Sequence, residues 1–187
     1  MHIAFIIFDG ITWLDLIGVY DPISRLRPMG YLPQLHWDIC AFTPTAKDPF
    51  GLAITPTRIQ QPLSGYDAII VPGGVGTRQL IQDTAFITWL QTAANVPYKI
   101  SVCTGSLLLG AAGFLTHVHA TTNFGEYEAL KPYCKAVLPQ RLVDDQQIIT
   151  AGAVASSLDL GLYLCEKWAG KAAREAISKR MDYTYGL

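Results

Sequence analysis

The chain has 187 residues, of which 50% are hydrophobic and 16% are charged, with a formal net charge of −1 at pH 7. This length is enough for one α/β domain with a sizeable core, and we expect residues 1–187 to form a single domain. The near-zero charge argues against nucleic acid or an anionic membrane as a partner. The longest apolar run, Leu107 to Leu115, is too short to span a bilayer.

The amino-terminal segment MHIAFIIFDG has neither a basic region nor a small-residue cleavage site, so it predicts a first strand rather than a signal peptide. The four cysteines, at positions 40, 103, 134 and 165, form no C-x-x-C pair. Their spacing indicates neither a zinc site nor a disulfide framework. We therefore expect a cytoplasmic protein with reduced thiols, with no metal and no organic cofactor.

Strands are predicted where continuous apolar runs end in turn residues, at 2–8, 36–42, 66–72 and 98–103. Helices are predicted at 13–26, 83–94, 104–112, 125–130, 156–168 and 171–182, with Gly170 separating the last two. Segment 141–152 predicts a hairpin with Asp144-Asp145 at its tip. This alternation indicates an α/β fold whose doubly wound, mostly parallel sheet is sandwiched by helices. Sites in such folds form at the carboxyl ends of the strands.

An acidic residue stands in the apolar stretch FDGITWLDLIGVYD (8–21) that follows the first strand. Asp15 lies among Trp13, Leu14 and Leu16, where a carboxylate is costly unless it is paired or protonated. The first strand ends at the same edge of the sheet as the strand 98–103, so Asp15 could reach a group there. The alternative is that this aspartate only caps or solvates its helix.

A glycine loop, DAIIVPGGVGTRQL (67–80), follows the third predicted strand, and Gly73-Gly74 present bare N–H groups. A pyrophosphate cradle is the rival interpretation. The loop lacks the third glycine of the dinucleotide fingerprint, an acidic residue at the usual offset and a Gly-Lys-Ser/Thr motif. We therefore favour oxyanion donation by the Gly74 N–H, opposite that of Thr104.

A cysteine marks the junction between a strand and a helix in ISVCTGSLLLGAAGFL (100–115). Cys103 lies at the carboxyl edge of a predicted central strand and in the first turn of a helix, an arrangement similar to a nucleophile elbow. Gly105 allows a close backbone approach, and the N–H groups of Thr104 and Gly105 would point at whatever Cys103 attacks. The alternative is that Cys103 is a small buried hydrophobic residue.

The chemistry of the elbow needs an ionised sulfur. A helix N-terminus contributes about 0.3–1 kcal/mol, which lowers a thiol pKa by less than about one unit from ~8.5. A thiolate therefore needs a second donor, and a protonated Asp15 could supply it if its pKa is raised by roughly 3 units. We expect Cys103 to be ionised at neutral pH. The rival partner is a histidine base, His117 or His119.

Together these segments resemble the ThiJ/PfpI superfamily, which is related to class I glutamine amidotransferase domains. The match includes FDGITWLDLIG, IIVPGG, SVCTGSLLLGAAGFL, ATTNF (120–124) and IITAGAVASSLDLGLYL (148–164), and it looks most like isonitrile hydratases and the sensor domains of AraC-type regulators. The resemblance implies a flavodoxin-like fold and a homodimer. It also implies Cys103 as nucleophile, Thr104 beside it and Asp15 as acid, in a hydratase that forms N-formamides through a thioimidate.

Two departures from the superfamily pattern affect the expected chemistry. Asn123 replaces the histidine of ATTH, which disfavours a peptidase or amidase and makes Asn123 a substrate-binding candidate. Relatives have LTGP where this chain has residues 16–19 as LIGV, so the pocket entrance is expected to differ. The alternatives are a stand-alone ligand or redox sensor and a glyoxalase or deglycase, although the last would be favoured by a glutamate at position 15.

Overall fold

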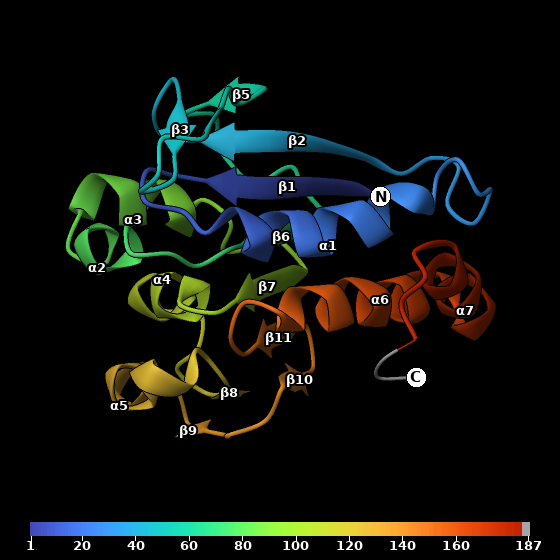
Figure 1. Cartoon of the computed structure of the whole chain (residues 1–187). Coiled ribbons are helices and arrows are strands. Elements are labelled where there is room, and N and C mark those ends of the chain that lie inside the picture. Colours follow the sequence, from blue (N-terminus) through green and yellow to red (C-terminus); the bar gives the residue numbers. More distant parts are fainter. Residues whose placement is uncertain (185–187) are drawn as a thin grey trace.

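The computed structural model describes residues 1–184, and its centre is a seven-stranded sheet (Figure 1). The strand order is β10–β11–β7–β6–β1–β2–β5. The strands are β1 (His2–Ile7), β2 (His36–Ala41), β5 (Arg58–Ile59), β6 (Ala68–Val71), β7 (Tyr98–Val102), β10 (Leu142–Asp145) and β11 (Ile148–Ala151). Every neighbouring pair is parallel except the β10–β11 hairpin. The predicted doubly wound, mostly parallel sheet is therefore confirmed.

The central strands are apolar along their length because helices flank the sheet. In β1, residues 3–7 are all completely buried, and β6 is buried throughout. The register places Ile3 of β1 beside Ala68 of β6 and Trp37 of β2. Since both faces of these strands are covered, they read as continuous hydrophobic runs rather than as alternating ones.

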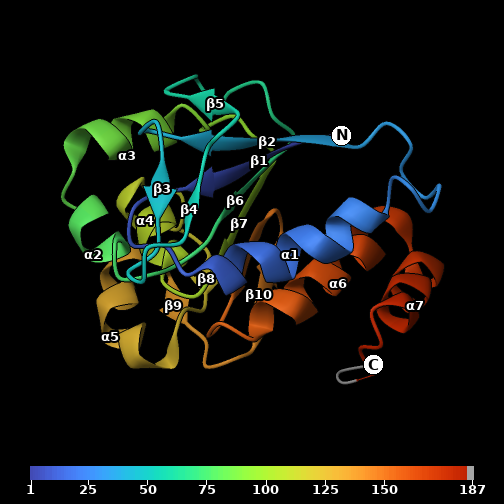
Figure 2. The ribbon, with the colours of Figure 1, turned by 45° about the horizontal axis from the view of Figure 1, so that its top comes forward.

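The helices form two groups, which Figure 2 shows at the lower right and at the left of the molecule. The first group is α1 (Trp13–Arg25), α6 (Ser156–Ala169) and α7 (Lys171–Arg180). The second is α2 (Thr77–Leu80), α3 (Thr84–Gln91), α4 (Gly105–Ala111) and α5 (Tyr127–Leu130), with 3₁₀ turns at Phe124–Glu126 and Lys131–Tyr133. No helix within residues 1–184 has the length and apolarity needed to cross a membrane.

Helices α1 and α6 approach each other closely, and this contact positions the first turn of α1. A Cβ on Gly18 would lie 2.0 Å from the hydroxyl oxygen of Ser157. The same hydroxyl donates to the carbonyl of Leu14 at 3.0 Å. The segment that carries Asp15 is therefore held against α6 by packing and by a hydrogen bond.

The hairpin forms as predicted, but its tip was wrongly placed. Gln146 and Gln147 make the turn, and Gln146 has φ +67°. Asp144 and Asp145 belong to β10 instead. Side-chain partners explain the difference, because Asp144 accepts from the Lys167 ammonium at 2.6 Å and Asp145 accepts from the His119 N–H at 2.8 Å.

Several short elements were not predicted. They are β3 (Ala46–Lys47), β4 (Ala53–Ile54), β5, β8 (His119–Ala120), β9 (Ala136–Val137) and α2. The strands among them have only two residues each, too few for a periodic pattern. The β3–β4 hairpin nevertheless contacts α1, because the indole N–H of Trp13 donates to the carbonyl of Leu52 at 3.0 Å.

Candidate active site

Three loops meet at the carboxyl ends of β1, β6 and β7. The arrowheads of β1, β2 and β7 point to the left of Figure 1, where α2, α3 and α4 lie. The loops after β1 and β6 are joined by backbone hydrogen bonds, from Thr12 N–H to Gly73 O at 2.9 Å and from Gly76 N–H to Gly10 O at 3.1 Å. The winding of the sheet reverses beside β1, which is where sites form in open α/β sheets.

Cys103 forms a strained elbow directly after β7. Its φ is +53°, a left-handed value that residues with a side chain rarely adopt. Hydrogen bonds hold this conformation: the Cys103 N–H donates to Gly152 O at 2.8 Å and to Ala151 O at 3.0 Å. Its carbonyl accepts from Thr122 Oγ1 at 2.9 Å and from Ser106 Oγ at 3.1 Å. The strand–elbow–helix arrangement predicted from the sequence is confirmed.

Two glycines permit the close approach of backbone segments around the elbow. A Cβ on Gly105 would lie 2.1 Å from the carbonyl oxygen of Val71, so α4 can begin against the end of β6 only with glycine there. Gly74 has φ +136°, and a Cβ on it would lie 2.2 Å from the carbonyl oxygen of Gly10. The predicted close approach at Gly105 is therefore present.

Asp15 lies in the first turn of α1 and is completely buried. Its Oδ2 accepts from the Gly73 N–H at 2.9 Å, whereas its Oδ1 has no hydrogen-bond partner among the described residues. Burial raises the pKa of Asp15 to about 6, against the opposing effects of the Gly73 N–H and of a hydrogen bond with Cys103. Asp15 is thus no solvated cap but a partner of the thiol.

The Cys103 thiol is also removed from water, with 5% of the residue exposed. Burial raises the pKa of this thiol, and the Asp15 carboxylate raises it further. Hydrogen bonds from Asn123 and Thr104 act in the opposite direction. The raised pKa is opposite to the expectation that Cys103 is ionised at neutral pH, because desolvation outweighs the hydrogen-bond donors. Each group shifts the pKa of the other, so Asp15 and Cys103 titrate as a coupled pair.

Asn123 directs an amide donor at the sulfur. Its Nδ2 lies 3.5 Å from Cys103 Sγ, and its Oδ1 accepts from the Gly125 N–H at 2.9 Å. The second hydrogen bond orients the amide, so the NH₂ group faces the thiol. Asn123 cannot titrate, unlike the histidine that it replaces. The preceding residue, Thr122, was not predicted as a functional residue, although it holds the carbonyl of Cys103.

Thr104 and Gly73 line the space beside the sulfur. The point where a Cβ of Gly73 would sit lies 2.6 Å from Thr104 N and 2.9 Å from Asp15 Oδ2. The amide of Gly74, predicted as an oxyanion donor, instead donates to Thr104 Oγ1 at 3.0 Å. That prediction is corrected, because the loops after β6 and β7 pack closely enough for the hydroxyl to take this N–H. The Thr104 N–H faces the sulfur of Cys103.

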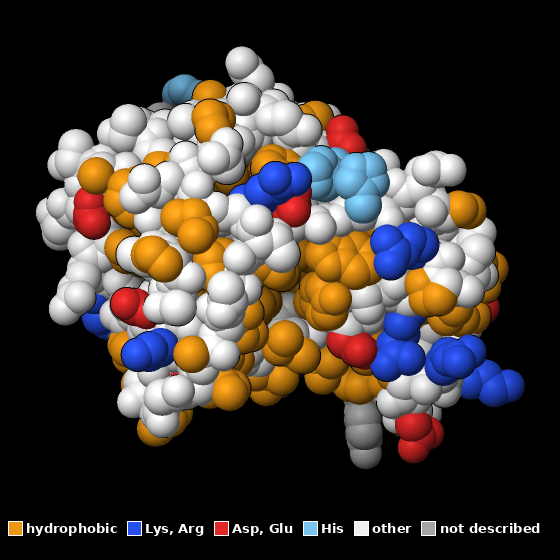
Figure 3. Space-filling view, turned by 90° about the horizontal axis from the view of Figure 1, so that it is seen from above, with side chains coloured by type: hydrophobic (Ala, Val, Ile, Leu, Met, Phe, Trp, Pro, Cys, Tyr) orange, Lys and Arg blue, Asp and Glu red, His pale blue; other side chains and the backbone are white. Residues whose placement is uncertain are grey.

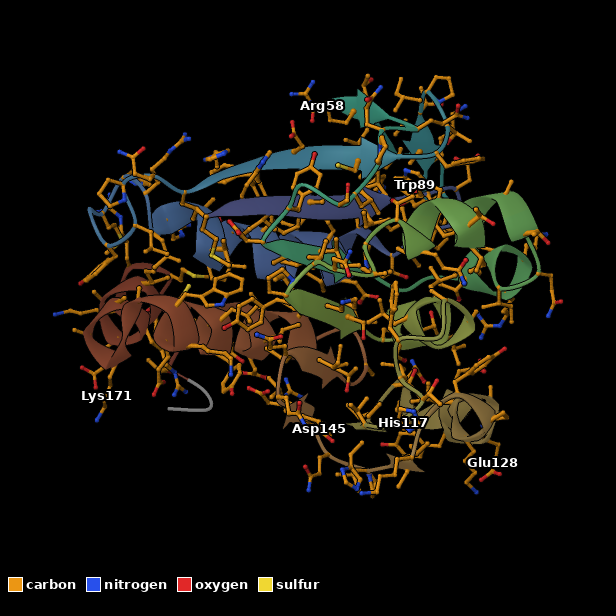
Figure 4. The ribbon with its side chains drawn as sticks, turned by 180° about the vertical axis from the view of Figure 1, so that it is seen from behind. Arg58, Trp89, His117, Glu128, Asp145 and Lys171 are labelled. Carbon is orange, nitrogen blue, oxygen red and sulfur yellow. The ribbon has the colours of Figure 1, made fainter. Side chains whose placement is uncertain are left out.

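The rival histidine bases lie elsewhere. Nδ1 of His119 is 2.9 Å from Asp145 Oδ2, and the described interactions of Cys103 include neither this residue nor His117. Figure 4, the view from behind, shows His117 and Asp145 on the lower side of the molecule. Within residues 1–184, no three His, Cys, Asp or Glu side chains are grouped so that they could hold a metal ion.

The sequence is similar to characterised proteins over nearly its full length. The DJ-1/PfpI family matches residues 1–167. Isonitrile hydratase of Pseudomonas putida is 30% identical over 184 residues, which cover 98% of this chain and 78% of that protein. The HTH-type transcriptional regulator GbdR of Pseudomonas aeruginosa is 25% identical over 187 residues, which cover 97% of this chain and 50% of the regulator.

Solved structures show the same architecture. A ThiJ/PfpI family protein from Pseudomonas syringae superposes with a TM-score of 0.89 at 28% identity, covering 100% of this chain and 76% of that one. DJ-1beta of Drosophila melanogaster superposes with a TM-score of 0.83 at 16% identity, covering 98% of both chains. The second similarity concerns the fold alone, and together they identify the fold as flavodoxin-like with a sheet flanked by helices.

Asp15→Asn is expected to stabilise the protein above about pH 6. The folded-state pKa of about 6 exceeds the ordinary value of 3.8, so the folded state retains a proton that the unfolded state has lost between these values. The wild type therefore loses stability as pH rises through this window, whereas Asn carries no such penalty. Urea unfolding should show a gain of about 1–3 kcal/mol at pH 7.5 and little change at pH 4.

The matched control is Glu175→Gln, because Glu175 is an exposed carboxylate on α7. This variant should leave the difference between pH 4 and pH 7.5 as in the wild type. A stability change for Asp15→Asn that is equal at both pH values would contradict the raised pKa of Asp15.

Proposed function

The chain belongs to the DJ-1/PfpI family, and from that premise we propose that it hydrates isonitriles, R–N≡C, to N-formamides through a thioimidate on Cys103. The observation that carries the proposal is the buried pair of Asp15 and Cys103, in which each group shifts the pKa of the other. Because burial raises both pKa values, the pair keeps one proton at neutral pH. Similarity to the isonitrile hydratase of Pseudomonas putida supports the choice of substrate.

The first step adds the S–H group across the terminal carbon of the isonitrile. The sulfur of Cys103 attacks that carbon and forms the C–S bond, while the single proton of the pair passes through Asp15 to the same carbon. The product is the thioimidate R–N=CH–S–Cys103, with the Asp15 carboxylate ionised. The bent elbow and the Thr104 N–H hold the sulfur in place for the attack.

The second step uses the carboxylate that the first step leaves behind. Asp15, now without a proton and with its pKa near 6, takes a proton from water as the oxygen adds to the C=N carbon. Asp15 passes that proton to the nitrogen, which gives the intermediate R–NH–CH(OH)–S–Cys103. The hydroxyl then loses its proton to Asp15 as the C–S bond breaks, and R–NH–CHO leaves. The sulfur and Asp15 again share one proton, so water and isonitrile are consumed in equal amounts.

The neighbours of the pair suit addition better than amide hydrolysis. Hydrolysis needs a group that protonates a leaving amine, and the Asn123 amide at 3.5 Å from the sulfur cannot transfer a proton. Its N–H groups instead stabilise negative charge on the sulfur. The free thiols of Cys40, Cys103, Cys134 and Cys165 suit a reducing compartment, and we place the protein in the cytoplasm.

A second candidate function is ligand sensing without turnover. It is favoured by the similarity to GbdR, of whose length this chain spans about half. A redox sensor is less suited to this site, because the thiol is buried and its pKa is raised. Catalytic turnover distinguishes a hydratase from a sensor that binds the same class of ligand.

We further propose a homodimer that forms through α1 and the β3–β4 hairpin. Leu14 and Ile17 on α1 are 49% and 43% exposed, and Phe50 and Leu52 on the hairpin are 94% and 60% exposed. The Trp13–Leu52 hydrogen bond brings the two segments together. Figure 3 shows hydrophobic side chains gathered around a hollow at the lower edge of the view. A second copy, presenting the same patch about a two-fold axis, would cover it.

Turnover of methyl isonitrile to N-methylformamide tests the function. The wild type should form the formamide catalytically, and Cys103→Ala should lower kcat/KM by about 10³-fold or more, because the nucleophile is lost. The control is Cys134→Ala, a half-buried thiol outside the site, which should retain turnover. Binding of the isonitrile without formamide would instead identify a sensor.

The pH dependence of kcat/KM should be bell-shaped. Below about pH 6 Asp15 is protonated and cannot accept the thiol proton, so the rate falls on the acid side. Above the raised thiol pKa the pair has lost the proton that carbon requires, so the rate also falls there. The residual activity of Asp15→Asn should lack the acid limb. An acid limb that persists in this variant would assign it to another group.

The double variant Leu14→Glu/Ile17→Glu should be monomeric, because charges placed in the patch repel across the two-fold axis. Light scattering after size exclusion would measure the mass of this variant, of the wild type and of the control Ala172→Glu, which alters an exposed position on α7. A wild type that stays monomeric at about 100 μM would contradict the proposed dimer.

A further inference from the structure

A cavity of ≈ 220 Å³ opens beside the elbow, bounded by the segments that hold Cys103 in place. Thr122 and Gly152 form part of its wall. The same two residues bind the backbone of Cys103, through Thr122 Oγ1 at 2.9 Å from its carbonyl and through the Gly152 carbonyl at 2.8 Å from its N–H. The cavity is therefore bordered by two separate segments that contact the Cys103 backbone.

The segment after Thr122 connects the cavity to the sulfur. Asn123 places Nδ2 3.5 Å from Cys103 Sγ, and the next residue, Phe124, lines the cavity. The phenyl ring of Phe124 is held open to the outside, since 75% of the residue is exposed. The ring of Tyr127 lines the cavity as well. A group attached to the atom that the sulfur attacks would thus have two aromatic residues nearby, Phe124 directly after Asn123 and Tyr127 one helical turn further on.

The charge in the cavity wall is already neutralised. Among residues 1–184, Arg141 is the only charged residue that lines it. Its Nε is ion-paired with Asp159, and its Nη2 donates to the Ala155 carbonyl at 3.2 Å. Asp159 also accepts from the hydroxyl of Tyr183 at 2.7 Å. An anionic substituent would have to compete with Asp159 for Arg141, and a cationic one would face the guanidinium. The lining therefore favours a neutral group.

The volume sets the size of that group. A cavity of about 150 Å³ accommodates benzene in a protein interior, so ≈ 220 Å³ holds one aromatic ring with a short extension. It is smaller than the roughly 300–1,000 Å³ of pockets that bind drug-sized molecules. From this placement we infer that the cavity receives the substituent of the substrate and selects neutral isonitriles whose substituent is about the size of one aromatic ring. This inference rests on the proposed hydratase function.

Ala153 offers a way to fill the cavity, because it lines the wall and is partly exposed to it. Ala153→Leu adds three carbon atoms there. Ala155→Leu makes the same change two residues along, where the side chain is exposed and lies outside the lining. The measured quantity is the ratio of kcat/KM for phenyl isonitrile to kcat/KM for methyl isonitrile.

The ratio for the wild type should be at least about 10. Burial of the phenyl ring favours binding, although part of this gain offsets the entropy lost when the ring is held in the cavity. Ala153→Leu should lower the ratio about 10-fold or more, and Ala155→Leu should leave it as in the wild type. 4-Carboxyphenyl isonitrile should react more slowly than phenyl isonitrile. An unchanged ratio in Ala153→Leu would overturn the inference.

A second measurement tests the cavity without any hydratase activity. The alkylation rates of Cys103 by iodoacetamide and by 2-iodo-N-phenylacetamide are compared by peptide mass spectrometry, which separates Cys103 from the other three cysteines. The phenyl reagent should be favoured in the wild type and in Ala155→Leu, and this preference should fall in Ala153→Leu. If the wild type shows no turnover but still prefers the phenyl reagent, the hydratase function is rejected and the role of the cavity in binding the substituent stands. If all three proteins show the same preference, that role of the cavity is rejected.

Discussion

The rest of the site depends on one constraint. The Asp15 carboxyl is removed from water and lies beside the Cys103 thiol. The residue is fully buried, and one of its oxygens has no partner among the described residues. An ionised carboxylate in that position is costly, and the cost appears as a pKa of about 6. Burial also raises the pKa of the Cys103 thiol, and this effect exceeds the opposing hydrogen bonds from Asn123 and Thr104. The two groups therefore hold one proton between them, and neither alone is a strong acid or a strong nucleophile.

The scaffold holds Asp15 and Cys103 in buried positions where the ionised form of each group is destabilised. Asp15 is fixed from one side by the close crossing of α1 and α6 at Gly18 and from the other by the N–H of Gly73. Cys103 is fixed in a left-handed conformation by hydrogen bonds to both of its backbone polar groups. Such strain persists only where the surroundings over-determine it. The stability lost at the pair is recovered elsewhere, in β6, which is buried throughout, and in residues 3–7 of β1, which are completely buried.

The sequence predicted the parts of this arrangement that depend on pattern. Continuous apolar runs predicted β1, β2, β6 and β7, and the cysteine at the end of one such run predicted the elbow. The carboxyl-edge rule brought Asp15 to Cys103. The features that could not be predicted depend on distances between segments that are far apart in the sequence. The ionisation of Cys103 is decided by how much water reaches it, and the partner of the Gly74 N–H by how closely two loops pack. Asp144 and Asp145 looked like turn residues, but tertiary partners hold them in β10.

Asn123 shows how a single neighbour selects among reactions that share a nucleophile. An isonitrile carbon accepts both the sulfur and a proton, so its addition needs one proton and releases no amine. In the proposed hydration, the pair of Asp15 and Cys103 would supply that one proton and recover it from water when the formamide leaves. A titrating group in place of Asn123 would add a second proton to the site and make the protonation state depend on three groups rather than two. The Asn123 amide is oriented by the hydrogen bond from the Gly125 N–H to its Oδ1. Its Nδ2, 3.5 Å from the Cys103 sulfur, can stabilise negative charge there without exchanging a proton. The number of exchangeable protons at the site therefore depends on Asp15 and Cys103 alone, and the proposed hydration requires one such proton.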